Sequence, residues 1–270
     1  MTVDERSAAP RADPVPVVVD YAAKPLRAVG RFFALAADTI MFIFIPPFAL
    51  REFITQSWFV ARVSLVPTVL LAIPFTVLGV FTFNIVLVDF GAADFSGAIA
   101  AAGAVTQIGP VVTVLVVAGA GSTAMCADLG ARTIREELDA LKVMGINPIH
   151  ALVVPRVLAS MVVAVLLFSV VVLVGLTGAF GFSVFIQHVS PGSFVSAFTF
   201  ITGVDDVVVA LIKAALFGLS AGMIACFKGT TVRGGPAGVG NAVNETVVFA
   251  FMALYLINVV ATAVGVKATM

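Results

Sequence analysis

Charged residues are scarce in this sequence. Asp, Glu, Lys and Arg together account for only 11% of the 270 residues, against about 25% in an ordinary soluble domain. The 15 acidic and 15 basic residues balance, so no excess of positive charge indicates nucleic-acid binding. Hydrophobic residues make up 61% of the chain and its mean hydropathy is +1.15. The composition therefore excludes an ordinary soluble domain and indicates an integral membrane protein.

Residues that support catalysis or cofactor binding are also rare. Cys126 and Cys226 are the only cysteines, too few for a disulfide framework, and we interpret them as small apolar residues near the cytoplasmic ends of helices. His150 and His188 are predicted on opposite sides of the membrane, so no zinc motif or Ser-His-Asp arrangement is expected. None of the five lysines follows a glycine, which excludes the G-x-x-x-x-G-K-[ST] loop that binds ATP. We therefore expect no catalytic residue, metal site or cofactor in this chain.

Five apolar runs are each long enough to cross a bilayer, which takes about 20 residues. They are Val63–Val88, Phe95–Ala127, a run from Arg156 to about Phe180, Val207–Phe227 and Thr246–Val266. The third run stays uncharged to Val204, but Gly181 and the turn Ser190-Pro191-Gly192 predict that its helix ends near Phe180 and that a segment on the outer surface follows. Small residues at Gly175 and Ala179, and at Gly218 and Gly222, predict close helix packing within this chain or against another subunit.

The first 50 residues precede these runs. Residues 1–20 contain three prolines among mixed charges, which predicts a disordered tail and not a signal peptide. Residues 21–50 repeat apolar side chains every three or four positions, with Lys24, Arg27 and Arg31 on another face. A basic amphipathic helix of this kind lies flat at the membrane interface; a helix packed on a soluble partner has the same pattern.

The basic residues predict the orientation of the chain, because cytoplasmic loops are rich in Lys and Arg. With the N-terminus in the cytoplasm, only Lys267 lies outside, and the connections Asp89–Gly97 and Gly181–Asp206 contain no basic residue. The basic residues inside or at the inner edge are Lys24, Arg27, Arg31, Arg51, Arg62, Arg132, Arg135, Lys142, Arg156, Lys228 and Arg233. The C-terminus is therefore predicted to lie outside an inner or plasma membrane.

A polar segment from Asp128 to Arg156 connects the second and third runs on the predicted cytoplasmic side. Its apolar residues recur with a roughly helical period, and Gly145 and Pro148 end the helix, which we place at about residues 130–148. Such a helix either docks into a groove of a soluble partner or is a solvated connection. The candidate contact residues are Glu136, Glu137, Leu138, Asp139, Leu141, Met144 and Gly145, with Leu138, Leu141 and Met144 as the expected anchors.

Two long motifs resemble a known family. GPVVTVLVVAGAGSTAMCADLGARTIREELDALKVMGINPIHALVVPRVLA and LIKAALFGLSAGMIACFKG are similar to the signature of the MlaE/YrbE permease family. The later stretch TVRGGPAGVGNAVNETVVFAF resembles the actinobacterial YrbE branch in its A-type paralogues. The resemblance covers residues 51–270 and implies an all-α integral membrane fold: an interfacial amphipathic helix, five transmembrane helices, and a cytoplasmic coupling helix between the second and third.

The resemblance also implies a function and partners. It implies the permease subunit of an ABC-type MCE lipid transporter, which imports hydrophobic lipids such as fatty or mycolic acids, sterols or phospholipids. The implied partners are a second YrbE-type permease (a B-type paralogue), a cytoplasmic ABC ATPase dimer that binds the ATP, and MCE-domain proteins on the outer side. Residues 139–145 also resemble part of the EAA loop of ABC importers, with Asp139 in place of Glu and a shorter spacing to Pro155. Ala120 stands where many family members have Arg, so we assign no role of that Arg to this chain.

Two ionisable residues are predicted in or beside the hydrocarbon region. Lys213 lies one to two turns into the fourth span and is the candidate for the lipid path, through an acidic headgroup or a neighbouring helix; the alternative is a side chain that snorkels to the outer headgroups. Glu245 is expected in the first turn of the fifth span, where the helix dipole favours a carboxylate. An ion-coupled secondary transporter that uses Lys213 and Glu245 is the rival function, and a membrane-embedded enzyme is a third; ion relays usually need more intramembrane carboxylates or histidines.

Overall fold

The protein is a bundle of membrane-spanning helices. The computed structural model describes residues 14–46, 48–89, 95–186, 188–201 and 203–269, and every regular element within these ranges is helical. Five stretches are long and apolar enough to cross a membrane: Leu50–Phe83, Gly97–Ile134, Ile149–Phe185, Val204–Thr230 and Gly235–Gly265. The predicted all-α membrane fold is confirmed, and the chain is a multi-pass membrane protein.

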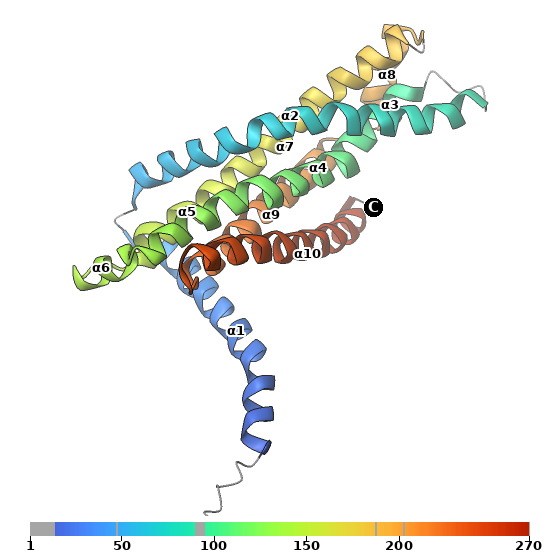
Figure 1. The fold of residues 1–270 in the computed structure, drawn as a ribbon. Coiled ribbons are helices and arrows are strands. Elements are labelled where there is room, and N and C mark those ends of the chain that lie inside the picture. Colours follow the sequence, from blue (N-terminus) through green and yellow to red (C-terminus); the bar gives the residue numbers. More distant parts are fainter. Residues whose placement is uncertain (1–13, 47, 90–94, 187, 202, 270) are drawn as a thin grey trace, which may run out of the picture.

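Successive spans run in opposite directions along one bundle (Figure 1). The first, fourth and fifth are single helices: α2 (Leu50–Asp89), α9 (Val204–Thr230) and α10 (Gly235–Thr269). The second consists of α3 (Ser96–Ala102), η2 (Gly103–Ile108), α4 (Gly109–Val116), η3 (Val117–Gly121) and α5 (Ser122–Ile134), and the third of η4 (Ile149–Val153) and α7 (Val154–Phe185), where η marks a π-helical turn. The short helices α6 (Glu137–Val143) and α8 (Pro191–Ile201) lie at opposite ends of the bundle, which we name the α6 end and the α8 end.

Helix α1 (Pro14–Ile43) leaves the α6 end at a steep angle to the spans (Figure 1). It contacts η4, α7 and α9 near that end, and Leu26 and Phe33 on its surface are exposed. This direction is the one expected of a helix in the membrane interface. The predicted tail is corrected in part: residues 1–13 lie outside the described ranges, but the chain is helical from Pro14 onward. Pro14 and Pro16 are compatible with a helix start because backbone N–H groups of the first turn have no helical acceptor.

The small residues singled out in the sequence pack within this chain. A Cβ atom on Gly218 of α9 would lie 2.3 Å from the carbonyl oxygen of Ser160 on α7, and one on Gly222 would lie 2.1 Å from the Ser160 hydroxyl. The Ser160 hydroxyl donates a hydrogen bond of 2.7 Å to the Gly218 carbonyl. Gly175 of α7 meets Thr76 of α2 in the same way, with a Cβ-to-Oγ1 distance of 2.5 Å. Close backbone approach therefore joins α2 to α7 and α7 to α9.

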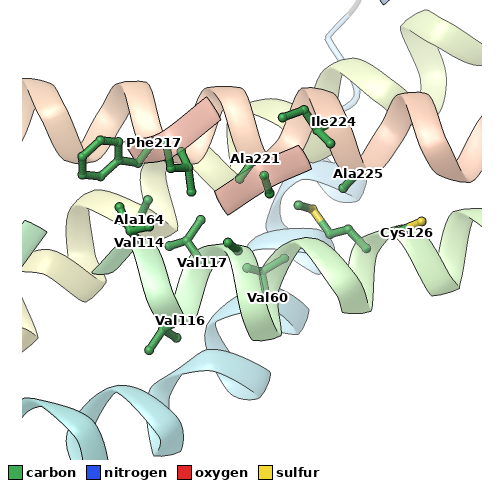
Figure 2. Packing of buried hydrophobic residues seen from close by; sticks show 14 of the residues in the cluster. Val60, Val114, Val116, Val117, Cys126, Ala164, Phe217, Ala221, Ile224 and Ala225 are labelled. Carbon is green, nitrogen blue, oxygen red and sulfur yellow. The ribbon is translucent and has the colours of Figure 1, made fainter. Parts of the chain in front are cut away.

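A neighbouring face of α9 packs against the second span. Figure 2 shows Phe217, Ala221 and Ala225 of α9 pointing toward Val114 and Cys126 in one cluster. Most of these side chains are small, so the two spans lie close together over several turns. In the core, α9 therefore packs against both α7 and the second span.

The helices extend beyond the predicted apolar runs. α2 begins at Leu50 and not at Val63, α7 ends at Phe185 and not near Phe180, and α10 begins at Gly235 and not at Thr246. The reason is that a charged side chain limits the part of a helix that lies in hydrocarbon without ending the helix itself. Glu245 therefore lies well inside α10, and the prediction that it stabilises a first helical turn is wrong.

Candidate functional site

Helix α6 projects from one end of the bundle, and a residue with a positive φ lies at each of its ends. Before it, Glu136 has a left-handed backbone with φ of 60°, which costs a residue other than glycine about 1–2 kcal/mol. After it, Gly145, which the sequence predicted as a helix end, has φ of 76°. The Gly145 amide donates to the Lys142 carbonyl at 3.0 Å and the Ile146 amide donates to the Leu141 carbonyl at 2.9 Å, which is the Schellman pattern of a helix end.

The break before α6 corrects the prediction of one helix over residues 130–148. Leu138 is only 8% exposed and packs in a cluster with Leu129, Leu152 and Val153. A continuous α5 would carry Leu138 past this cluster, whereas the left-handed turn at Glu136 directs it back onto the bundle. Burial of one leucine, about 1.5–3 kcal/mol, is enough to offset the strained turn.

The structure divides the predicted contact residues into two groups. Leu138 is buried within the chain itself, Leu141 is half-buried in the same cluster, and Asp139 pairs with Lys142 at 2.8 Å. Met144 is 64% exposed, and its neighbour Val143, which the sequence analysis did not single out, is 89% exposed. The apolar surface that α6 offers to another molecule is therefore formed by Val143 and Met144, and Leu138 is a residue of the bundle core.

Sequence reasoning missed an ionic network beneath α6. Arg156, at the start of α7, is completely buried, and its two terminal nitrogens lie 3.2 Å from Glu52 Oε1 on α2 and 2.7 Å from Asp128 Oδ2 on α5. Asp128 also faces Arg132 Nε at 3.4 Å, and Arg132 reaches toward Glu137 of α6 at 3.9 Å. The signal in the sequence was that Asp128 and Arg156 each limit an uncharged run on the same side of the membrane. Their pairing depends on the helix arrangement.

Lys213 lies in a second polar site, between α9 and α10. It is 3% exposed, and its Nζ donates a hydrogen bond of 2.8 Å to Thr262 Oγ1 on α10. The side chain therefore contacts a neighbouring helix, one of the two arrangements expected of a functional lysine, and does not extend along the surface of the bundle. Within the described ranges, no carboxylate oxygen lies within 4.0 Å of its ammonium group, so its partner there is the Thr262 hydroxyl.

Two hollows meet at Lys213. One, of about 210 Å³, has a mixed lining, in which Thr106, Gln107 and Asp206 lie beside apolar Val209 and Ala210. The other, of about 580 Å³, is lined by apolar side chains of α9 and α10, among them Leu216 and Val260. Thr106 and Gln107 belong to the π-helical turn η2, and such turns often occur at functional sites. A buried cation and several polar side chains therefore lie beside an apolar groove.

Glu245 belongs to a different place from Lys213. It pairs with Lys228 at 2.5 Å, and the Lys228 ammonium lies 4.4 Å from the centre of the Phe249 ring. From Lys213 to Lys228 the axis of α9 spans about 22 Å, at 1.5 Å per residue. The structure does not bring Lys213 and Glu245 together into one ion site.

The two cysteines and His150, which the sequence analysis also considered, make structural contacts. Cys126 and Cys226 are buried free thiols, and His150 Nε2 lies 3.0 Å from the Ile45 carbonyl oxygen, which ties η4 to the end of α1. Among the described residues, no three side chains of His, Cys, Asp or Glu are grouped so that they could hold a metal ion.

A bundle of five apolar spans with a short, capped helix projecting from one end is the architecture of a membrane permease subunit. A family model described as Permease MlaE matches residues 53–264. A probable ABC transporter permease protein of Synechocystis is 31% identical over 181 residues, which cover 66% of this chain and 69% of the relative. Another, of Rickettsia prowazekii, is 27% identical over 254 residues, which cover 93% of this chain and 97% of the relative. The intermembrane phospholipid transport system permease protein MlaE of Haemophilus influenzae is 29% identical over 181 residues, 67% of this chain and 69% of the relative.

The chain belongs to the MlaE permease family. The members of this family are non-catalytic, membrane-spanning subunits of ABC-type lipid transport systems, and ATP hydrolysis takes place on a partner ATPase.

Proposed function

We propose that this chain is the permease subunit of an MCE-type ABC transporter that imports lipids with an anionic headgroup. The observation that carries the proposal is α6, a helix with defined ends and an exposed apolar tip at Val143 and Met144. Because the chain has no ATP-binding loop, the free energy of ATP hydrolysis has to arrive through a contact with another protein. A short rigid helix that inserts into a groove of an ATPase is suited to that contact.

The proposed orientation follows from the basic residues. The α6 end of the bundle (Figure 1) carries basic residues from α5, the α5–α6 turn, α6, the last turns of α9 and the α9–α10 connection: Arg132, Arg135, Lys142, Lys228 and Arg233. By the positive-inside rule this end faces the cytoplasm, where an ATPase dimer would meet α6. MCE-domain proteins would then meet the α8 end, and the C-terminus would lie on that outer side.

The proposed second permease packs on α10. Only 11% of the most apolar stretch of this helix is buried, against 50% for α9. Val248, Met252, Leu256 and Val259 are exposed, and their spacing places them along one side of the helix. A B-type paralogue with a similar fifth span would cover this side and would close the apolar hollow beside Lys213 toward the membrane.

Lys213 supports the choice of headgroup. A buried ammonium group with no carboxylate within 4.0 Å among the described residues favours an anion over a neutral molecule, although Asp206 in the same hollow weakens this preference. Of the lipids that the sequence left open, fatty or mycolic acids and phospholipids carry a carboxylate or a phosphate, whereas sterols do not. The apolar hollow next to the ammonium group suits acyl chains.

The test of this function is retention of the ATPase by α6. We expect the wild-type complex, purified in detergent, to contain its ATPase and to hydrolyse ATP faster when an anionic lipid is added. Val143→Arg combined with Met144→Arg should remove the ATPase, because interface energy concentrates in a few apolar anchors. Arginine is chosen because a cation at the end of a helix does not oppose the helix dipole.

A matched control separates this effect from damage to the membrane domain. Phe185 is 77% exposed at the α8 end, and Phe185→Arg should leave ATPase retention unchanged. Retention of the ATPase by the α6 double variant, with unchanged ATP turnover, would show that α6 is not the coupling contact.

A further inference from the structure

We infer that Arg156 is the positioning residue that transmits movement of α6 to α2 and α7, an inference that rests on the proposed ATPase-coupled function. The contacts form one continuous path across four helices. Glu137 of α6 lies next to Arg132 and Arg135, with the shortest contact of 2.8 Å between Glu137 Oε1 and Arg135 Nε. Arg132 and Arg156 then share one oxygen of Asp128, and Arg156 reaches Glu52.

Arg156 is the point where this path enters the bundle. Its guanidinium group contacts α5 and α2 at once and also donates a hydrogen bond of 3.0 Å to the Leu152 carbonyl in η4. A planar group with donors on several sides can hold two carboxylates in fixed positions, which a lysine ammonium cannot do in the same way. A displacement of Asp128 with α5 is therefore passed to Glu52, which is itself held by the Gln56 amide at 3.0 Å.

Stability alone does not explain this network. Burying a guanidinium group and its carboxylates costs several kcal/mol per ion, and replacing a buried ion pair by apolar residues is often neutral or stabilising. The network is also incomplete in this arrangement, because the Arg156 Nε and the Gln56 Oε1, both buried, have no hydrogen-bond partner among the described residues. The free Arg156 Nε and Gln56 Oε1 can form a second set of hydrogen bonds when α6 moves. Two alternative sets of contacts are what a two-state coupling element requires.

The left-handed turn at Glu136 concentrates movement at the start of the path. α6 is joined to α5 through this turn, through the charged pairs that surround it and through Leu138, which packs with Leu129, and α6 itself is capped at its far end by Gly145. A force on Val143 or Met144 therefore rotates α6 as a short rigid body about Glu136. Glu137 then transmits the displacement to Arg132.

The experiment measures lipid moved per ATP hydrolysed. The complete transporter is reconstituted in proteoliposomes with phosphatidylglycerol that carries a fluorescent acyl chain, and Arg156→Lys and Glu52→Gln are compared with wild type. Glu52→Gln leaves the Asp128–Arg156 pair in place, so it tests the path even if Arg156→Lys does not assemble. Arg51→Gln, an exposed neighbour on α2, is the matched control.

We expect both test variants to keep the ATPase and to hydrolyse ATP, while lipid moved per ATP falls about tenfold, equivalent to about 1.4 kcal/mol. The control should keep the wild-type ratio. An unchanged ratio in Glu52→Gln overturns the inference, and so does loss of the ATPase from both variants, since Arg156 would then only hold the fold together. A wild-type complex that holds no ATPase refutes the proposed function itself, a result distinct from either of these.

Discussion

Burying an ammonium group within a membrane span costs about 2.5–3.5 kcal/mol on insertion scales, and Lys213 offsets part of this cost with its hydrogen bond to Thr262. The Thr262 hydroxyl in turn donates to the Asn258 carbonyl at 2.6 Å, so it is oriented to accept from the lysine. Among the described residues, Lys213 uses one donor for Thr262, so its other two donors are open to a ligand in the hollow. This is the arrangement on which the proposed role of Lys213 in binding an anionic headgroup rests.

Lys213→Met tests this role, because methionine has a similar length and no charge. Transport of phosphatidylglycerol should fall about tenfold or more, the effect of losing a hydrogen bond to a charged group of at least about 1.5 kcal/mol, and Lys213→Arg should restore part of it. ATPase retention should not change. Val208→Met, at an exposed position on α9 that lines neither hollow, is the control, and normal transport by Lys213→Met would show that the lysine serves only packing.

At the scale of single residues, the sequence was a better guide to chemistry than to contacts. Lys213 and Gly145 stood out by their positions in the chain, one inside an apolar run and one before a proline-containing turn. Arg156 did not stand out, because a basic residue at the edge of a span is common and its two carboxylate partners come from separate helices.

At the scale of elements, helix packing depends on positions where no side chain fits. The contact of α7 with α9 relies on Gly218 and Gly222, which both face Ser160. Gly222→Ala should lower the melting temperature of the purified protein, since overpacking costs about 1–3 kcal/mol. Ser160→Ala in the same chain should recover part of the loss, because the nearest atom to the added methyl group is the Ser160 hydroxyl.

Gly119→Ala is the control for this pair, because a Cβ atom there has no heavy atom within 4 Å. It should leave the melting temperature nearly unchanged. If Gly222→Ala is as stable as Gly119→Ala, then α7 and α9 can separate without loss and the close contact is not a determinant of the fold.

The second span shows an element that hydropathy describes incompletely. Its apolar run was predicted as one span, and it is one, but the π-helical turns η2 and η3 interrupt it. η2 turns Thr106 and Gln107 toward the hollow at Lys213. The sequence gives no local reason for a π-helical turn there, because the turn depends on how the span fits between α7 and α9.

At the scale of the whole molecule, the two ends of the bundle should be accessible from opposite sides of the membrane. Ala237 at the α6 end and Val204 at the α8 end are both exposed, and the native Cys126 and Cys226 are buried, so they give little background labelling. A membrane-impermeant maleimide should label Val204→Cys in intact cells and Ala237→Cys only after permeabilisation.

The labelling result decides between orientations that the bundle alone leaves equivalent. Labelling of both cysteines from one side would contradict five antiparallel spans. Labelling of Ala237→Cys alone in intact cells would place the α6 end outside, and an intracellular ATPase could not then reach Val143 and Met144.

The sequence by itself determined the number of spans and the turn at Gly145 before Pro148. These depend on local properties: the length of an uncharged run, a proline that removes a backbone donor, and a backbone conformation that glycine adopts without strain. The family was predicted from long sequence motifs for a related reason, because a motif is a property of consecutive residues.

Tertiary structure alone decided which charges meet. Glu52, Asp128 and Arg156 come from three spans and meet because close packing of α2, α7 and the second span brings their ends together. The same packing buries Leu138 in the core and leaves Val143 and Met144 exposed, and it pairs Lys213 with Thr262 while keeping it from Glu245. Hydropathy and spacing specify where a helix runs, but partners across helices depend on distances that only the folded bundle sets.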